Sequence, residues 1–191
     1  RHYHIKMSET KHTFLVPEEL EKLENLELTG RHTRLAPSLD AFLFCCYTGL
    51  RYSDFVNLSE KNIVTIDKKP WLVFNTIKTG TEVKLPLTFL FEGKAWKLLR
   101  KHKGHLSEFF SIKPNSTVNK ELLRIRKIAG LEKHFSFHSA RHTNATLLLY
   151  KGANITTVQK LLGRRNVTTT KIYREVMGTT RDKDLRKCAK R

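Results

Sequence analysis

Long apolar runs are missing from this sequence of 191 residues. A membrane-spanning helix needs about 18 consecutive apolar residues, and the longest run, at residues 41–47, is far shorter and predicts a buried helix instead. Internal repeats and low-complexity blocks are also missing, which excludes solenoid and fibrous architectures. The start of the chain shows no signal-peptide pattern. These absences predict a soluble globular protein with no membrane partner, and its length suits one substantial domain or at most two small ones.

Cysteine is scarce, with three residues in the whole chain. Cys45 and Cys46 are neighbours within the apolar run, a position typical of reduced core thiols in an intracellular protein. No Cys-x-x-Cys pair occurs, so a zinc knuckle is not expected. The chain also lacks the Gly-x-x-x-x-Gly-Lys-Ser/Thr loop of ATP-binding enzymes. We therefore expect no cofactor and no metal.

Acidic residues are few, because 18 Asp and Glu stand against 36 Lys and Arg, a formal net charge of +18. Such a surface favours a polyanionic partner, and nucleic acid is the leading candidate since each phosphate contact releases a counterion. Binding to an anionic membrane would favour a single basic amphipathic helix or tail, whereas basic residues here occur along the whole chain. A merely solvated basic surface is the remaining alternative.

Apolar periodicity and chain breakers predict mostly helices. Helices are expected from Pro17 and at residues 37–48, 52–58, 89–103, 116–129, 139–150, 154–163, 167–176 and 181–190. Segments rich in β-branched residues, separated by turns, predict an antiparallel meander at residues 62–67, 71–78 and 82–86. The expected fold class is α+β, a mainly helical domain with a small three-stranded antiparallel sheet on its flank.

A first segment that can carry chemistry is His-Ser-Ala-Arg-His at residues 138–142. Residues three apart share a helix face, so His138 and Arg141 can point at one spot near the positive N-terminus of a helix. A phosphate suits such a spot. His142 follows His138 at a spacing that can hold zinc, but the glutamate of a His-Glu-x-x-His site is absent. A solvated helix start is the alternative.

The second segment is Thr-Gly-Leu-Arg-Tyr-Ser-Asp at residues 48–54. Arg51 directly follows the end of an apolar helix, and its planar guanidinium can hold two oxygens of one phosphate. Asp54, three residues later, is placed to brace it. An ordinary structural Arg–Asp pair is the alternative reading.

Two further segments are weaker on their own. Lys78 occupies the Ile-Lys-Thr-Gly turn, from which it could reach a DNA groove or give a proton to a leaving oxygen. Tyr173 ends a Thr-rich segment that follows Leu-Leu-Gly at residues 161–163. A turn lysine is usually only solvated, and a tyrosine is more often a core ring than a nucleophile.

Together these segments resemble the tyrosine recombinase (phage-integrase) family. Arg, Lys, His-x-x-Arg, a basic residue after Leu-Leu-Gly, and Tyr occur in the family's order, and the resemblance covers almost the whole chain. Three segments carry it: Thr-Gly-Leu-Arg-x-Ser-Asp, His-x-x-Arg-His and Leu-Leu-Gly…Thr-Thr-x-x-Tyr. Among family members, the chain most resembles integrases of mobile genetic elements.

The resemblance implies a role for each residue. Arg51 and Arg141 would clamp the scissile phosphate, and Lys78 would protonate the leaving 5′-oxygen. His138 would act as acid or base at the phosphate, and Tyr173 would be the nucleophile. The other assignments are supporting positions for Asp54 and His142, and DNA contacts by Thr79, Arg165 and Lys171.

One position departs from the family pattern. The family usually has His or Trp directly after Leu-Leu-Gly, nine residues before the tyrosine, and this chain has Arg164 there. Arg can donate to a phosphoryl oxygen, but it cannot act as a base because its pKa stays above about 12. Arg164 is still expected to belong to the catalytic set.

The implied activity is site-specific DNA recombination or integration through a 3′-phosphotyrosine intermediate, without metal or ATP. The implied partner is double-stranded DNA, bound by a homotetramer on two DNA sites during synapsis and by a chain that is monomeric alone. The alternatives are a DNA-binding domain with impaired catalysis and relaxation of the type IB topoisomerase kind. A basic RNA-binding module is a third, but it predicts stacking aromatics on a sheet, which the short meander lacks.

The resemblance also bears on organisation and location. Residues 1–13 are expected to be a linker from an N-terminal core-binding domain, and residues 14–191 the catalytic domain. The expected location is the cytoplasm of a bacterial-type cell, in association with the nucleoid.

Overall fold

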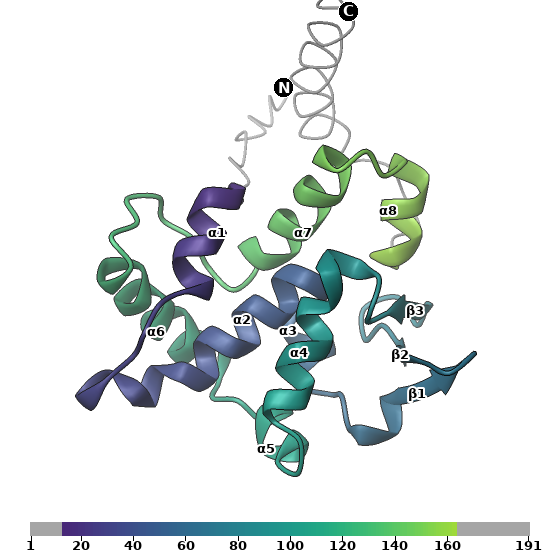
Figure 1. Ribbon diagram of the computed structural model, residues 1–191, viewed down its shortest axis with the longest axis horizontal. Coiled ribbons are helices and arrows are strands. Elements are labelled where there is room, and N and C mark those ends of the chain that lie inside the picture. Colours follow the sequence, from purple (N-terminus) through teal and green to yellow (C-terminus); the bar gives the residue numbers. More distant parts are fainter. Residues whose placement is uncertain (1–12, 164–191) are drawn as a thin grey trace, which may run out of the picture.

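The computed structural model describes residues 13–163, and the predicted helices at 167–176 and 181–190 lie outside them. Its elements, in chain order, are α1 (Pro17–Glu24), η1 (Gly30–Leu35), α2 (Ala36–Thr48), α3 (Tyr52–Phe55), η2 (Glu60–Asn62), β1 (Ile63–Ile66), β2 (Lys69–Asn75), β3 (Glu82–Pro86), η3 (Leu90–Gly93), α4 (Lys94–Lys101), α5 (Leu106–Phe110), α6 (Asn115–Ile128), α7 (Ser139–Tyr150) and α8 (Ile155–Leu161). The predicted fold class is confirmed: the helices form the body and one three-stranded sheet lies on its flank (Figure 1).

Helix α2 is the centre of the helical body (Figure 1). It packs against α7, α4, α6, α5 and α1, and every residue from Ser38 to Thr48 is buried. A helix that is apolar on all sides must be covered on all sides, and this is what the run at residues 41–47 predicts. Helix α7 is the second buried helix, since all its residues from Ser139 to Leu149 are buried.

The thiols inside α2 behave as the sequence predicts. Cys45 and Cys46 are free and fully buried. Burial raises the pKa of both thiols well above the usual value, because the apolar surroundings disfavour a thiolate. Reactive cysteines need the opposite environment, so these two are packing residues.

The sheet is the predicted antiparallel meander, with β2 in the centre. Ile63 pairs with Leu72, and Leu72 pairs with Leu85. Buried residues of β2 and β3, such as Phe74 and Val83, alternate with more exposed ones, so that one face of these strands joins the core. Contacts between α8 and β3 attach this sheet to the C-terminal end of the described chain.

The structure corrects several predicted boundaries. The helix expected at 89–103 begins only at Lys94, because Phe91 and Glu92 have positive φ angles of 49° and 57° that no α-helix contains. The helix expected at 52–58 ends at Phe55. Strand β2 covers Lys69–Asn75 instead of 71–78, which leaves Lys78 in the turn that follows. The segment from 104 to 114 contains the short helix α5.

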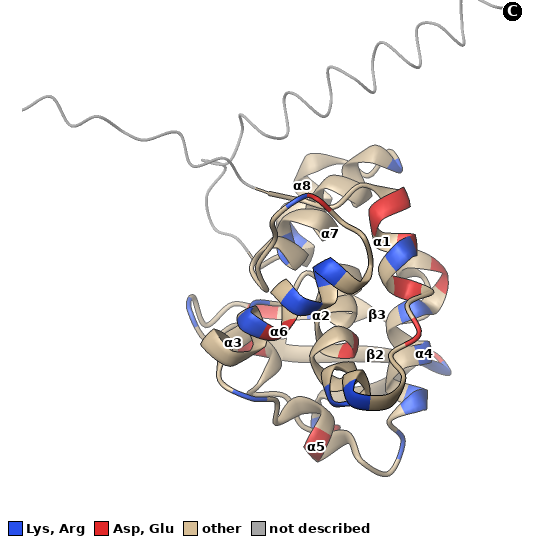
Figure 2. Ribbon diagram, turned by 90° about the vertical axis from the view of Figure 1, so that its left-hand side faces the viewer, with Lys and Arg blue, Asp and Glu red and all other residues tan. Residues whose placement is uncertain are grey.

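The basic residues of the described part of the chain are not concentrated on one helix (Figure 2). Figure 2 shows Lys and Arg on many elements around the molecule, as the sequence predicts. Within residues 13–163 there is no helix whose length and apolar character would allow it to cross a membrane.

Candidate active site

Arg51 lies where α2 gives way to α3. Gly49 ends α2 with φ 73°, a left-handed conformation that suits glycine, and the chain then turns sharply. Arg51 Nη1 lies 3.5 Å from Asp54 Oδ2, and the Asp54 side chain is only 1% exposed against 19% for Arg51. The predicted brace between these two residues is therefore present. Arg51 keeps an accessible edge while its partner is buried.

Asp54 also reaches the turn that carries Lys78. Its second oxygen, Oδ1, accepts a hydrogen bond from the backbone N–H of Ile77 at 2.9 Å. Lys78 is the next residue along the chain and is exposed. One buried carboxylate thus links Arg51 to the turn that carries Lys78, which is 27 positions later in the sequence.

The turn between β2 and β3 is built from threonine hydroxyls. Thr76 Oγ1 and Thr79 Oγ1 are 2.6 Å apart, and Thr79 Oγ1 and Thr81 Oγ1 are 3.0 Å apart. The N–H of Gly80 closes the turn on the carbonyl oxygen of Thr76 at 2.8 Å. Thr79 Oγ1 also donates to the carbonyl oxygen of Gly163 at 3.4 Å. The half-buried hydroxyl of Thr79 is engaged inside the protein, and its contact with DNA stays a prediction.

Arg141 is a buried arginine at the beginning of α7, with 2% exposure. Its Nη1 donates to the carbonyl oxygen of Gly49 at 2.7 Å and its Nη2 donates to that of Leu162 at 2.6 Å. Hydrogen bonds from a charged donor are short and strong. Arg141 therefore fixes the end of α2 against the end of α8, and the two bonds set the plane of its guanidinium.

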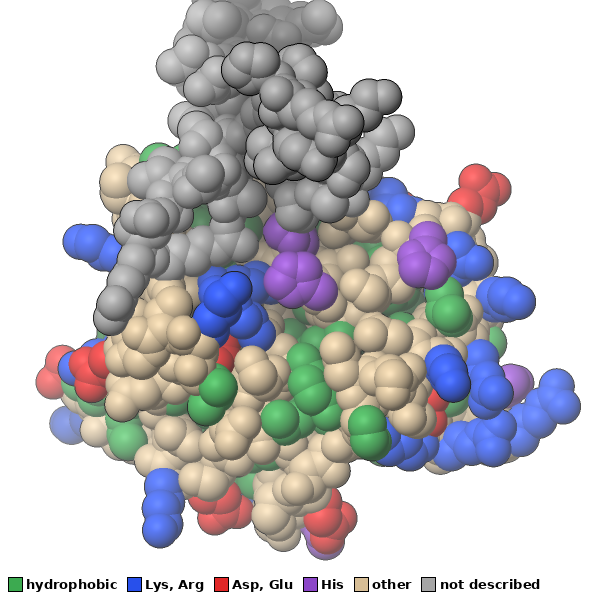
Figure 3. Space-filling model, turned by 180° about the vertical axis from the view of Figure 1, so that it is seen from behind, with side chains coloured by type: hydrophobic (Ala, Val, Ile, Leu, Met, Phe, Trp, Pro, Cys, Tyr) green, Lys and Arg blue, Asp and Glu red, His purple; other side chains and the backbone are tan. Residues whose placement is uncertain are grey.

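His138 and His142 begin α7 together. His138 is the N-cap residue and is exposed, whereas His142 is buried one turn further on. Their rings meet edge to face, with 4.9 Å between the centroids. Helix N-termini carry partial positive charge, so His138 lies in a place suited to an anion. On the face in Figure 3, histidine side chains adjoin a group of Lys and Arg side chains.

These contacts close into a ring. Asp54 contacts both Arg51 and the N–H of Ile77. Two residues later, Thr79 contacts the carbonyl oxygen of Gly163. Arg141 binds the carbonyl oxygens of Leu162 and Gly49, and Gly49 lies two residues before Arg51. The ring brings together the Arg51, Lys78 and Arg141 segments and the end of Leu-Leu-Gly. Of the predicted site residues, Arg164, Arg165, Lys171 and Tyr173 lie outside the described residues.

Glycine is required at two points of this ring because the chains come too close for a side chain. A Cβ on Gly49 would collide with the side chain of Leu162 and lie 2.8 Å from Asn144 Oδ1. A Cβ on Gly163, which has φ 59°, would lie 2.8 Å from Val83 Cγ2 and 2.9 Å from Thr76 Cγ2. Both glycines of the family-like segments are thus explained by geometry.

Sequence reasoning missed the residues that hold the ring together from inside. Asn144, which is 1% exposed, donates from Nδ2 to the carbonyl oxygen of Cys46 at 2.9 Å and ties α7 to α2. The signal for it was present, since the first half of this helix carries several polar residues where a buried helix is usually apolar. No signal of that kind marks Thr76 or Thr81, because turn threonines are common.

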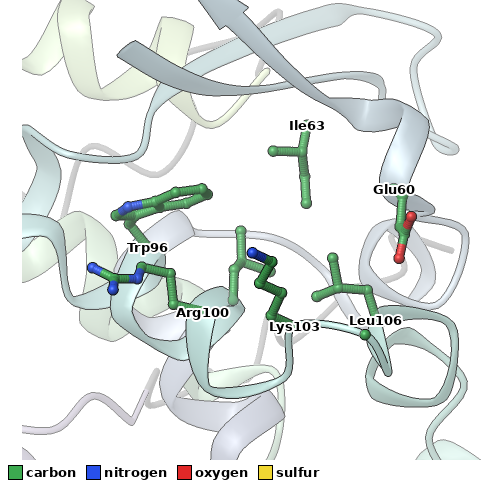
Figure 4. A pocket seen from close by; sticks show the side chains of 8 residues that line it. Glu60, Ile63, Trp96, Arg100, Lys103 and Leu106 are labelled. Atoms are coloured by element: carbon green, nitrogen blue, oxygen red, sulfur yellow. The ribbon is translucent and has the colours of Figure 1, made fainter.

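Within residues 13–163, no three His, Cys, Asp or Glu side chains are grouped so that they could hold a metal ion. An open groove of about 560 Å³ lies elsewhere, between α4, α5 and the start of β1 (Figure 4). It is lined by Glu60, Ile63, Trp96, Leu99, Arg100, Lys103, Gly104 and Leu106. None of these is a predicted site residue, so the ring of contacts is a better candidate for the site than this groove.

The sequence of the chain matches a known protein family. The sequence profile of the phage integrase family matches residues 13–178. This chain belongs to the phage integrase family. The predicted resemblance to tyrosine recombinases is thereby confirmed.

Named relatives and a solved structure are consistent with this membership. A tyrosine recombinase of Pseudothermotoga lettingae is 32% identical over 170 residues, which cover 86% of this chain and 56% of the relative. The tyrosine recombinase XerC of Oceanobacillus iheyensis is 34% identical over 179 residues, covering 85% and 56%. A crystal structure of a lambda integrase tetramer bound to a Holliday junction shares the fold, with a TM-score of 0.66, 23% identity, and coverage of 87% of this chain and 49% of that one. The chain spans about half the length of these proteins.

Proposed function

We propose that this chain is the catalytic part of a site-specific DNA recombinase that cuts and rejoins strands through Tyr173. One observation carries the proposal: the closed ring of contacts that joins the Arg51, Lys78 and Arg141 segments to the end of Leu-Leu-Gly. Separate stretches of sequence, each ambiguous alone, meet at one place. Family membership supports assigning strand transfer to that place.

In the proposed reaction the two arginines hold the scissile phosphate. Its transition state spreads more negative charge over the equatorial oxygens than the diester carries, so fixed guanidinium groups stabilise it more than the ground state. The Arg51 side chain is partly exposed and can therefore reach the phosphate. The two carbonyl bonds of Arg141 hold its guanidinium in a fixed plane. Preorganised cations replace a metal ion in this scheme, and Arg164 would add a further donor.

Bond making and breaking follow from the remaining groups. The Tyr173 oxygen attacks phosphorus, its proton passes to His138, and a 3′-phosphotyrosine forms. The bond to the 5′-oxygen breaks, and Lys78 gives that oxygen a proton. A 5′-hydroxyl from a partner strand then attacks the phosphotyrosine and gives its proton to Lys78, while Tyr173 leaves and takes its proton back from His138. The phosphodiester energy is kept in the covalent intermediate, so no ATP is consumed.

We further propose double-stranded DNA as the partner and a homotetramer as the form that exchanges strands, with a monomer in the absence of DNA. Exchange between two duplexes involves four strand cleavages, and the tetramer of lambda integrase on a Holliday junction is a precedent for the arrangement. Residues 1–13 would be the linker to a core-binding domain and residues 14–191 the catalytic domain. Arg165 and Lys171 would contact DNA. The site of action would be the nucleoid in the cytoplasm, on mobile genetic elements.

The experiment that tests this function is covalent trapping on labelled nicked DNA, in which the cleaved end diffuses away. The wild-type protein should form a protein–DNA adduct that is stable in detergent, and Tyr173→Phe should form none. An adduct with Tyr173→Phe would overturn the nucleophile assignment. No adduct with the wild-type protein, despite DNA binding, would favour the impaired DNA-binding domain instead.

Two controls separate the remaining alternatives. Trapping should proceed unchanged in EDTA, and restoration by magnesium after loss in EDTA would overturn the metal-free scheme. A supercoiled plasmid without target sites should not be relaxed, because relaxation without a partner strand is the activity of a type IB topoisomerase.

A further inference from the structure

We propose that Thr79 is a positioning residue for Lys78: its hydroxyl fastens the lysine-bearing turn to the carbonyl group of Gly163. This inference rests on the proposed function, because it concerns the proton that Lys78 gives to the leaving 5′-oxygen. It assigns to Thr79 a role inside the protein, whereas the sequence predicts a contact with DNA.

The contacts around Thr79 define one consistent set of hydrogen-bond directions when Thr79 donates to Gly163. A hydroxyl has one proton to donate and two lone pairs that accept. Thr79 Oγ1 donates to the Gly163 carbonyl oxygen, so it must accept from Thr76 Oγ1 and from Thr81 Oγ1. Thr76 Oγ1 in turn accepts from the N–H of Thr81 at 3.1 Å. With this set of directions every donor and acceptor position of Thr79 is used, and the three hydroxyls and the Gly163 carbonyl oxygen form one connected set of hydrogen bonds.

This arrangement anchors the chain on both sides of Lys78. Before it, the N–H of Ile77 is held by Asp54, which also faces Arg51. After it, Thr79 is held by Gly163. A lysine side chain has a long flexible stem, so its ammonium can be placed reproducibly only if its backbone is fixed. The exposed side chain of Lys78 thus projects from a backbone held at its two neighbours.

The anchor also sets Lys78 relative to Arg141. Gly163 follows Leu162, whose carbonyl oxygen accepts from Arg141 Nη2. Two consecutive carbonyl groups at the end of α8 therefore hold two parts of the site: that of Leu162 accepts from Arg141, and that of Gly163 accepts from Thr79 in the lysine turn. The residue after them is Arg164, so the same backbone segment leads directly into the position that departs from the family pattern.

Thr79→Val tests the inference, because valine keeps the shape and removes the hydroxyl, and Thr79→Ser is the matched control that restores it. Cleavage is measured on two nicked substrates, one ordinary and one with sulfur in place of the bridging 5′-oxygen. A thiol has a pKa near about 8.5, far below that of an alcohol, so a thiolate leaves without a proton. Lys78→Ala, tested on both substrates, gives the pattern expected when proton donation is lost.

Thr79→Val should slow cleavage of the ordinary substrate about tenfold, because a turn that is no longer fastened presents the Lys78 ammonium to the leaving oxygen less reproducibly. On the sulfur substrate the deficit should shrink to within about twofold of wild type, as it should for Lys78→Ala. Thr79→Ser should resemble wild type on both. The Kd for uncleaved DNA should be unchanged by Thr79→Val.

An equal deficit of Thr79→Val on both substrates would overturn the inference, and so would a weakened Kd that accounts for the loss, which would indicate a direct DNA contact. If Thr79→Val does not fold, Thr79→Ala gives the same test, since it also removes the hydroxyl that reaches Gly163. The proposed function fails separately: in that case the wild-type protein forms no adduct on either substrate.

Discussion

Arg141 Nη2 lies 2.6 Å from the carbonyl oxygen of Leu162, so a buried arginine of α7 caps the C-terminus of α8. The last carbonyl groups of a helix have no partner within it, and here a cation supplies one. The same side chain caps α2 through Gly49. The residue proposed to clamp the phosphate is therefore also a structural fastener, and its loss should be visible in stability as well as in activity.

Arg141→Lys should lower the free energy of unfolding by about 2–4 kcal/mol, because a lysine cannot serve both carbonyl groups and hydrogen bonds to charged groups contribute about 1.5–3 kcal/mol each. Urea denaturation measures this. Arg124→Lys is the control, since Arg124 is an exposed residue of α6, and it should change stability by less than about 0.5 kcal/mol. Equal stability of Arg141→Lys and wild type would show that the two carbonyl bonds contribute little.

Gly49→Ala should destabilise the protein by about 2–4 kcal/mol, the sum of a left-handed backbone and a collision with Leu162 and Asn144. Gly130→Ala separates the two causes, because Gly130 also has a positive φ, 63°, but has open space around it. It should cost only about 1–2 kcal/mol. Similar losses for the two variants in urea denaturation would mean that the close approach at Gly49 relaxes easily.

Asp54→Asn should keep the hydrogen bond to the Ile77 N–H but remove the negative charge that faces Arg51. We expect cleavage to fall about tenfold, since a guanidinium that is no longer braced presents its donors less reproducibly. Asp54→Ala, which also releases the Lys78 turn, should be slower still. Single-turnover cleavage rates on nicked DNA give the comparison, and an Asp54→Asn protein as fast as wild type would argue against the brace.

Arg164→His should leave cleavage unchanged or raise it, because histidine can donate to the phosphoryl oxygen and is usual at this position of the family. Trapping rates on nicked DNA are the readout. A drop of about a hundredfold or more would mean that the rest of this site is adapted to arginine at position 164.

DNA affinity should fall steeply with salt, in keeping with the formal net charge of +18. A protein that neutralises 6–10 phosphates loses about 10³–10⁵ in affinity between 50 and 200 mM salt. Fluorescence anisotropy over that range measures the slope. A flat response would count against a polyanionic partner.

Much of the site follows from local sequence. Gly49 ends an apolar helix, the three-residue spacing of Arg51 and Asp54 puts them in contact, and Asn154 caps α8 by accepting from the N–H of Thr156. Each of these depends on a few neighbouring residues and on known helix-end chemistry. That is why the sequence alone predicts them.

Other features depend on contacts between distant segments. The early end of β2 arises because Thr76 pairs with Thr79 and with the N–H of Thr81, in competition with the strand ladder. The break before α4 puts Phe91, which has a positive φ angle, against Tyr47 with 5.8 Å between ring centroids. The acceptors for Arg141 are backbone carbonyl groups, which every residue has, so no side-chain pattern could identify them.

Because both acceptors of Arg141 belong to the backbone, the anchoring does not depend on which side chain stands at position 162. In a saturation library, position 162 should tolerate other apolar residues of similar volume, while Arg141 and Gly49 should tolerate almost nothing. Sequence divergence near the site is thus limited by the backbone conformation that places these carbonyl groups more than by complementary pairs of side chains. Pairs of substitutions that compensate each other across the Arg141 contacts with Gly49 and Leu162 should therefore be rare.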